Sequence, residues 1–290
     1  MTEPPVDAQA WLNQLTAWID ANSLKGYDPF DVKQHPLIRA CQPYKWPRRA
    51  TTALSDAVPV LLRRTLGIAK TDNPKAYALV AHGSLRMFQA SGDDSHLERA
   101  EELLQWLLEH PSTGYSGLCW GYPFDVFAKG LDTPRNTPIG VVCAIAGEAF
   151  ALAHALTGKD AYGDAVVAIA AFFLNDIPRM ADGGTYCFGY TPKDRRRVHN
   201  ANLHAVSHLY RATHVSGDRQ FQQAAEPALE FSLRGQRTDG AWPYGEWDPS
   251  EPFERGLMTI VDHHHTGFVL RSLDEIERYA PSQVLDDAIG

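Results

Sequence analysis

Three times the chain repeats a pattern first seen in Ser91-Gly92-Asp93-Asp94-Ser95-His96-Leu97: a small hydroxyl residue, Gly, polar residues, and then an apolar or aromatic residue. The second copy is Thr157-Gly158-Lys159-Asp160-Ala161-Tyr162, and the third is Ser216-Gly217-Asp218-Arg219-Gln220-Phe221. A recurrence every roughly 60 residues indicates a repeated supersecondary unit. We therefore take this repeat as the building unit of the fold.

Each copy lies between two stretches in which apolar residues recur about every 3.6 residues, as on one face of a helix. The Gly can adopt the left-handed conformation that ends the first helix, and the polar residues after it can begin the second. Each copy therefore predicts a helical hairpin with a short connection. The predicted helix pairs are 76–89 with 97–108, 139–156 with 162–174, and 201–214 with 221–233.

Three further stretches have the same periodicity: 10–21, 51–66 and 266–279. The total is about nine or ten helices, or roughly five or six hairpins. No convincing period-2 pattern appears, so strands should be few. The sequence predicts an all-α toroid of helical hairpins in one domain over residues 8–280, with loose termini at 1–7 and 281–290.

Between the hairpins run long connections rich in Gly, Trp, Tyr, Pro and Asp: 110–137, 177–198 and 236–263. Long loops inside a compact domain tend to be functional. Because short and long connections alternate, the three long loops must emerge at the same end of the stacked hairpins. We call this end the rim, and we expect a binding cleft there.

The formal net charge is −8, and the densest basic run is Lys193-Asp194-Arg195-Arg196-Arg197. A nucleic-acid surface normally needs a basic stripe that displaces counterions from phosphates, so we expect no nucleic-acid partner. The arginine run is either a solvated loop or the holder of an anionic group such as a uronate or a phosphate, with Arg196 as the binding candidate.

Several other classes lack sequence support. The chain has no P-loop, no Rossmann fingerprint after a strand and no GxSxG elbow, so we expect no nucleotide chemistry, no serine hydrolysis and no cofactor. It also has no basic segment leading into an apolar stretch and no apolar run near the roughly 20 residues that span a bilayer. These features predict a cytoplasmic protein without a membrane span.

The first rim loop contains Trp120, Tyr122 and Asp125 among several glycines. Aromatic rings stack on sugar faces, and a carboxylate binds hydroxyls or moves a proton, so these residues suit a sugar site. Asp125 is the acid–base candidate, and Trp120 and Tyr122 are the substrate-binding candidates. The alternative is a buried aromatic turn in which Asp125 caps the next segment.

The second rim loop contains Tyr190 and ends at His199 and Asn200, where a predicted helix begins. A helix N-terminus polarises a nearby anionic group, and a neutral His there can act as a base. His199 is therefore a catalytic candidate, and Tyr190 and Asn200 are substrate-binding candidates. The alternative is that Asn200 or Asn202 only caps the helix while His199 packs on the loop.

The third rim loop contains Trp242, Tyr244 and Glu246. Trp242 and Tyr244 are candidates for stacking on substrate. Glu246 lies between Tyr244 and Trp247, which could desolvate the carboxyl group and raise its pKa, so we expect Glu246 to be catalytic.

The run Asp262-His263-His264-His265 precedes the last predicted helix. Metal-binding histidine pairs on a helix prefer an i, i+4 spacing, so adjacent histidines do not favour a metal site, and none is predicted. Instead we expect His265 to face the cleft as a catalytic residue, with Asp262 as its orienting or capping partner.

These loop sequences resemble a family of uncharacterised prokaryotic proteins that are often associated with polysaccharide and capsule genes and are related to the six-hairpin (α/α-toroid) glycosidases. The resemblance spans residues 72–279 and rests on 117–125, 198–202, 239–246 and 262–268. It implies a toroid fold and a carbohydrate-related role. The chain departs from the family at Val126, where an aromatic residue is usual, and at His263-His264, where Asn and an aromatic residue are usual.

Three functions are compatible with these features. The first is a glycoside hydrolase that acts on an oligo- or polysaccharide, with Asp125 and Glu246 as its two carboxylates. The second is a polysaccharide lyase or uronate C5-epimerase, in which His199, Asn200, Tyr190 and an arginine remove a proton and neutralise a carboxylate. The third is a non-catalytic glycan-binding protein of a polysaccharide biosynthesis system. In each case the partner is a carbohydrate, neutral or anionic.

Overall fold

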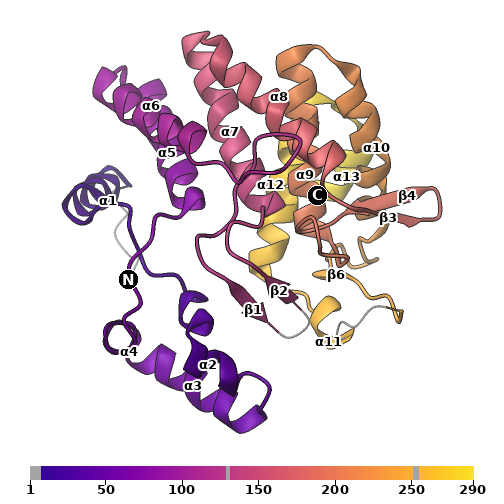
Figure 1. Ribbon diagram of the computed structural model, residues 1–290. Coiled ribbons are helices and arrows are strands. Elements are labelled where there is room, and N and C mark those ends of the chain that lie inside the picture. The colour runs from indigo at the N-terminus through magenta and orange to yellow at the C-terminus, as the bar shows by residue number, and fades with distance from the viewer. Residues whose placement is uncertain (1–7, 129–130, 251–254) are drawn as a thin grey trace, which may run out of the picture.

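The computed structural model describes residues 8–128, 131–250 and 255–290 (Figure 1). The N-terminal stretch 1–7, expected to be loose, lies outside the described residues. The described chain is mostly helical, so the prediction of an all-α toroid is confirmed. Four helical hairpins follow one another: α5 (Pro74–Ser91) with α6 (Asp94–Glu109), α7 (Gly140–Thr157) with α8 (Asp160–Asn175), α9 (His199–Ser216) with α10 (Arg219–Arg234), and α12 (His263–Tyr279) with α13 (Gln283–Ile289).

The first helices of the four hairpins form an inner layer. Helix α7 packs between α5 and α9, and α12 packs against the other side of α9. The second helices, α6, α8, α10 and α13, each pack on their own hairpin partner and cover the inner layer from outside. The apolar core lies between these two layers, and it includes Phe150, Phe173 and Leu209.

The three predicted turns take the expected conformation. Gly92, Gly158 and Gly217 have φ values of 70°, 66° and 75° and follow the last residue of α5, α7 and α9. The N–H of each Gly donates to the carbonyl four residues earlier at 2.8 Å. A side chain with a Cβ is strained at such φ values, so Gly is the residue that closes these turns.

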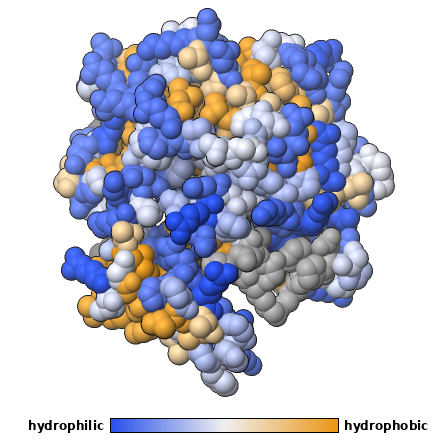
Figure 2. All heavy atoms as spheres, in the orientation of Figure 1, coloured by the Kyte–Doolittle hydropathy of each residue, from blue (hydrophilic) through white to orange (hydrophobic). Residues whose placement is uncertain are grey.

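The first part of the chain forms shorter elements: α1 (Ala8–Asn22), a 3-10 turn (Asp31–Gln34), α2 (Pro36–Cys41), α3 (Lys45–Ala57) and α4 (Pro59–Thr65). The single helix predicted over 51–66 is therefore wrong, because Pro59 lacks an N–H and restricts Val58 before it. Val58 has φ −134° and ψ 58°, which ends α3. In Figure 2, apolar surface gathers over the region of α2, α3 and α4.

The C-terminal tail, expected to be loose, instead forms α13. The side chain of Ser282 accepts a hydrogen bond from the Leu285 N–H and caps this helix. Leu285 is buried in the main core. One cap and one buried leucine therefore hold a helix that is too short to show clear periodicity in the sequence.

The long loops meet at the rim, as predicted. The first contains β1 (Val126–Ala128) paired with β2 (Leu131–Thr133), and the second contains β3 (Arg179–Asp182) paired with β4 (Thr185–Phe188). The second and third loops are joined to each other by β5 (Arg197–Val198) and β6 (Gly245–Glu246), which pair antiparallel. The third loop also holds α11 (Arg255–Met258).

Helix α7 is the most apolar of the inner helices. By length and composition alone it could cross a membrane, but 61% of it is buried inside the fold. The core helix of a soluble protein has the same character, so this helix is weak evidence for a membrane span.

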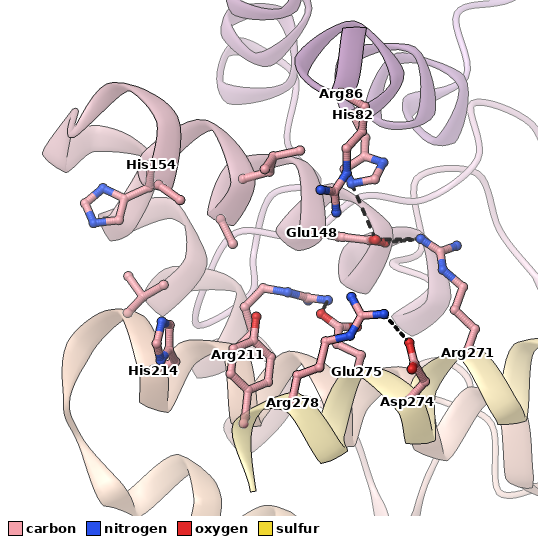
Figure 3. Close-up of a pocket in the computed structure, with 15 residues that line it drawn as sticks. His82, Arg86, Glu148, His154, Arg211, His214, Arg271, Asp274, Glu275 and Arg278 are labelled. Atoms are coloured by element: carbon pink, nitrogen blue, oxygen red, sulfur yellow. Dashed lines mark hydrogen bonds and ion pairs between the residues drawn. The ribbon is translucent and has the colours of Figure 1, made fainter. Parts of the chain in front are cut away.

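A carboxylate halfway along α7 links three inner helices (Figure 3). Arg271 of α12 donates to both oxygens of Glu148 at 2.5 and 2.6 Å, and His82 Nε2 of α5 lies 3.5 Å from Glu148 Oε1. Burial alone would raise the pKa of Glu148, but the positive charges of Arg211, His82 and Arg271 outweigh burial and lower it. Glu148 is therefore an ionised carboxylate that joins α7 to α5 and α12, the first and last helices of the inner layer.

Close packing of α7 on α9 yields a stability prediction. A Cβ added to Gly147 would lie 2.2 Å from Cε1 of His208, whose Nε2 lies 3.0 Å from the Val166 carbonyl oxygen. Because the ring cannot move without breaking that contact, Gly147→Ala should lower the free energy of unfolding by about 1–3 kcal/mol in urea titrations.

The matched control is Gly83→Ala on α5, where an added Cβ meets nothing within 4 Å. Alanine is the better helix former, so this variant should be neutral or more stable by up to about 1 kcal/mol. Equal effects of the two substitutions would show that α7 and α9 are not packed as closely as described.

Candidate functional site

The pairing of β5 with β6 brings His199 to Glu246. The His199 N–H donates to the Tyr244 carbonyl at 3.1 Å, and its Nε2 lies 3.3 Å from Glu246 Oε1. Its Nδ1 lies 3.3 Å from Ser232 Oγ, and the ring is fully buried. The ring of His199, a predicted catalytic residue, is thus shielded from solvent and contacts the rim at Glu246.

The predicted direction of the Glu246 pKa shift is wrong. The hydrogen bond with His199 lowers the pKa of Glu246, and this effect exceeds the opposing effect of burial. The side chain is 44% exposed, so the flanking aromatic residues do not enclose it. Glu246 is therefore an ionised, accessible carboxylate and is unsuited to donate a proton as a general acid.

Asp262 and His265 form a second pair at the start of α12. One carboxylate oxygen, Oδ1, accepts the His265 N–H at 2.8 Å, and the other, Oδ2, lies 2.6 Å from His265 Nδ1. These hydrogen bonds lower the pKa of Asp262, first through the main-chain N–H and then through the ring. Since an ionised carboxylate only accepts, Nδ1 must carry a proton, which leaves Nε2 as the ring nitrogen that can exchange one.

The ring of His265 is oriented by its neighbours and remains partly exposed. The edge of its ring packs against Tyr244, with ring centroids 4.6 Å apart. Its side chain is 35% exposed. An oriented and partly exposed imidazole, at a helix N-terminus and beside an aromatic ring, has the geometry of an acid–base group.

Tyrosines surround a buried ion pair beside this histidine. Arg196 makes two hydrogen bonds from Nε to the buried Asp194, at 3.0 and 2.9 Å, and its guanidinium lies 5.6 Å from the centre of the Tyr190 ring. Burial raises the pKa of Tyr190 and of Tyr244, so both phenols stay neutral. The charge of Arg196 is balanced by Asp194, so the structure adds no argument for an anionic substrate at this residue.

Two buried polar side chains on α9 lie one helical turn apart, Asn200 and His204. Oδ1 of Asn200 and Nε2 of His204 are buried without a hydrogen-bond partner among the described residues. Burial lowers the pKa of His204 to about 4. Its ring packs on Phe268 of α12 at 5.5 Å, and Phe268 packs on His264 at 4.8 Å. Buried polar atoms without partners are rare, which makes this face of α9 part of the candidate site.

Both predicted tryptophans belong to the core instead of the cleft. Trp120 and Trp242 are 1% and 3% exposed. The indole N–H of Trp120 donates to the Leu107 carbonyl at 2.9 Å, and that of Trp242 donates to the Ser232 carbonyl at 2.8 Å. Their role is to anchor the first and third rim loops to α6 and α10. Of the predicted stacking residues, Tyr122, Tyr190 and Tyr244 remain at least partly exposed.

Asp125 is held within the first rim loop. Its Oδ1 accepts the Arg135 N–H at 2.8 Å and lies 3.8 Å from Arg135 Nε. Among the described residues, no hydrogen bond joins Asp125 to Glu246, so the predicted carboxylate pair gains no geometric support. The burial of Phe124 agrees with the alternative of a buried aromatic turn, but Asp125 accepts the N–H of Arg135, ten residues on, and does not cap the next segment.

Sequence reasoning missed two residues that the fold brings to the site. Asp28 lies near enough to Tyr122 to raise the pKa of that phenol, which burial and Asp28 together bring to about 12. Burial raises the pKa of Asp28 itself. The sequence signal for Asp28 was the stretch 26–31, which combines Gly, aromatic residues and carboxylates as the rim loops do. For His204, the signal was its i, i+4 spacing from Asn200.

A cavity of about 540 Å³ lies at the opposite end of the inner layer from the rim (Figure 3). The later turns of α5, α7, α9 and α12 line it, and it carries several arginines. Arg271 binds Glu148, Arg211 binds Glu275, and Arg278 binds Asp274. Because its carboxylates are bound to arginines, we assign this cavity a structural role.

A second cavity, of about 550 Å³, lies beside the first rim loop. It is lined by Gly121, Pro123 and Asn136 of that loop and by Trp106 and His110 from the end of α6. Trp106 stacks on Tyr77 at 3.7 Å and on His110 at 4.4 Å. The rim is thus hollowed on the side of the first loop. In the described part of the chain, no three His, Cys, Asp or Glu side chains are grouped to hold a metal ion.

Solved structures of several sugar-processing enzymes have this fold. A cellobiose 2-epimerase from Spirochaeta thermophila is 14% identical, with a TM-score of 0.58, over 98% of this chain and 85% of its own. A glycoside hydrolase family 76 mannosidase from Bacteroides thetaiotaomicron is 10% identical, with a TM-score of 0.55, over 90% of this chain and 72% of its own. At such identities the likeness establishes the α/α-toroid fold alone.

A sugar epimerase from a ruminal bacterium is 12% identical, with a TM-score of 0.53, over 75% of this chain. This chain spans only 57% of the length of that epimerase. No family model and no curated protein sequence matches the chain.

The lowered pKa of Glu246 predicts how its contribution to stability depends on pH. An ionised Glu246 stabilises the fold fully above its unfolded-state pKa of about 4.3, and this contribution is lost as the pH falls through the lower folded-state pKa. The stability difference between wild type and Glu246→Gln should therefore narrow as the pH falls from neutral toward about 3. Urea unfolding at a series of pH values measures it.

Glu230→Gln is the control, because Glu230 forms only an exposed pair with Arg234. The difference in the free energy of unfolding between Glu230→Gln and wild type should change little with pH. If the stability difference between wild type and Glu246→Gln did not depend on pH, the contact between Glu246 and His199 would not form in solution.

Proposed function

We propose that this protein is a carbohydrate-active enzyme that moves a proton on a sugar, in the manner of an epimerase or a lyase, with His265 as the acid–base group. The observation that carries the proposal is the 2.6 Å contact between His265 Nδ1 and Asp262 Oδ2 in a side chain that remains accessible. This contact fixes both the tautomer and the direction of the ring.

The chemistry requires a base close to a carbon-bound proton that is acidified by a neighbouring carbonyl or carboxylate. Nε2 of His265 can accept such a proton while Asp262 stabilises the imidazolium that forms. Tyr244 lies against the same ring and offers an aromatic surface and a neutral hydroxyl donor. A sugar bound on Tyr244 would thus present a C–H to the histidine.

In an epimerase one group removes a proton from the carbon and a second group returns one from the other face. His204 lies on α9 across Phe268 from the start of α12, and its lowered pKa keeps it neutral, so its ring can accept the proton in the direction of reaction in which the imidazolium of His265 returns one. Asn200, one turn closer to the rim, has an unpartnered amide oxygen that can accept a sugar hydroxyl.

The fold supports this proposal, since a cellobiose 2-epimerase and a sugar epimerase share it. The residues at the rim are also easier to reconcile with proton transfer than with hydrolysis. A hydrolase needs one carboxyl group that donates a proton and one that activates water. Glu246 suits only the second role, and Asp125 is engaged with Arg135.

Glycoside hydrolysis remains the second candidate, because Glu246 is an ionised carboxylate that is 44% exposed at the rim. The fold is also that of a family 76 mannosidase. Under this alternative, Glu246 activates water, and Asp125 or another residue of the first rim loop donates the proton.

The proposal predicts solvent deuterium in the product. The protein is incubated in D₂O with neutral reducing disaccharides and, separately, with uronate oligosaccharides, and the products are followed by NMR and by near-ultraviolet absorbance. We expect deuterium at the inverted carbon for an epimerase, or an absorbing unsaturated sugar for a lyase. His265→Gln should lower kcat by about 100-fold or more, as expected on removal of a general acid–base group.

His263→Gln is the matched control, because His263 is an exposed neighbour on the same turn. It should keep wild-type activity. New reducing ends without deuterium, lost in Glu246→Gln and kept in His265→Gln, would replace the proposal with hydrolysis. Glycan binding without turnover of either substrate class would instead identify a binding protein.

A further inference from the structure

The segment from Asp31 to Lys70 has the opposite charge to the rest of the chain. It contains eight Lys and Arg residues against two Asp residues, a formal net charge of +6, whereas the whole chain carries −8. One of the arginines, Arg63, forms a buried ion pair with Asp31 at 2.8 Å. The remaining positive charge is therefore on the surface of α2, α3 and α4 and their connections.

Helix α3 turns its apolar side toward solvent. Trp46 and Leu54 are 73% and 47% exposed, and they share one face of the helix with Ala50 and Ala53, which are also exposed. Arg48 lies on the opposite face and is only half-exposed. A surface helix of a globular protein normally buries its apolar face, whereas the apolar face of α3 is exposed.

The neighbouring elements extend this surface. We call their exposed apolar side chains the N-terminal patch: Leu37, Tyr44, Trp46, Leu54, Val60 and Leu61. Figure 2 shows apolar surface interleaved with polar side chains in this region. Arg49 lies 5.5 Å from the Trp46 ring, and Lys45 and Arg64 are exposed beside the patch.

The exposure of the N-terminal patch does not come from a lack of folded structure. Val32, Ile38 and Leu62 form a small core of their own, with Leu66 and Ile68 packed against it. The buried Arg63 also donates to the Asp28 carbonyl at 2.7 Å. The apolar side chains of the patch are thus those that remain outside after this small core has formed.

We propose that the N-terminal patch docks on the surface of an anionic phospholipid bilayer. Helices that lie in a bilayer interface combine Trp and Leu on one face with Lys and Arg around it, and basic residues are attracted to the anionic headgroups. Trp and Tyr are enriched at the headgroup level, because their rings are apolar and their tips polar. The charge of the patch and its exposed aromatic and aliphatic side chains meet these requirements together.

Two other occupants fit less well. A nucleic acid would use the positive charge and could stack on Trp46, but it offers nothing to Leu37, Val60 and Leu61. An apolar protein surface would cover the leucines but would leave the positive charge unmatched. Helix α1 also exposes apolar side chains, Trp11, Leu15 and Trp18, but it contains no Lys or Arg. It therefore lacks the positive charge that distinguishes the N-terminal patch.

The test is co-sedimentation of the full chain with vesicles of phosphatidylglycerol and phosphatidylcholine, compared with vesicles of phosphatidylcholine alone. We expect binding to the anionic vesicles that weakens as salt is raised, and little binding to the neutral ones. The double variant Arg49→Glu/Arg64→Glu and the single variant Trp46→Ser should each bind about tenfold more weakly.

Matched controls make the same changes elsewhere. Arg219→Glu reverses an exposed charge on α10, and Val284→Ser removes an apolar side chain that is 61% exposed on α13. Both should bind vesicles like wild type, and thermal unfolding should verify that all the variants are folded.

Four results would overturn the proposal: binding to neither kind of vesicle, equal binding to both kinds, tighter binding of a random oligonucleotide than of anionic vesicles, or self-association in sedimentation velocity that Trp46→Ser abolishes. The last two would assign the patch to a nucleic acid or to a second copy of the chain.

Discussion

The carboxylate of Glu148 is the constraint on which the arrangement of the inner helices depends. Each hairpin can close on its own through a left-handed glycine, but nothing in a hairpin determines how far the inner layer curves. Arg271 and His82 reach Glu148 from α12 and α5, and so bring the first and last inner helices to the same point on α7. The side chain of Glu148 is only 20% exposed, so loss of these partners would leave a poorly solvated charge and destabilise the arrangement of the inner helices. With the curvature fixed, α12 packs on α9, and the ring of His204 meets that of Phe268 between the two helices.

Much of this fold could be predicted, because its determinants are local. A glycine at φ near 70° and a helical period each depend on neighbours within a few residues, so Gly92, Gly158 and Gly217 identified three hairpins directly. The errors came from features that periodicity does not reveal. Pro59 splits a helix whose apolar pattern runs on through it, and α13 is held by Ser282 and Leu285, two residues that leave almost no pattern.

The site was predictable to the extent that its contacts are local. Asp262 and His265 are three residues apart, and a helix start brings them together whatever the rest of the chain does. His199 and Glu246 are 47 residues apart and meet only through the pairing of β5 with β6, so the sequence suggested both residues but not their contact. This contact reverses the expected pKa shift of Glu246. The composition of the loops was equally ambiguous for Trp120 and Trp242, because an indole with one N–H serves a sugar cleft and a buried loop anchor alike.

The double use of Asp262 limits how position 262 can change during evolution. One oxygen caps α12, and the other holds the ring of His265. Ser or Thr would serve a helix N-terminus about as well, so folding alone would allow the position to drift among small polar residues. Only a carboxylate also fixes the tautomer of the histidine. In a related protein that did not use the His265 imidazole, we expect α12 to be kept and Asp262 to be replaced by another capping residue. The residue at position 262 would then show whether the imidazole is used.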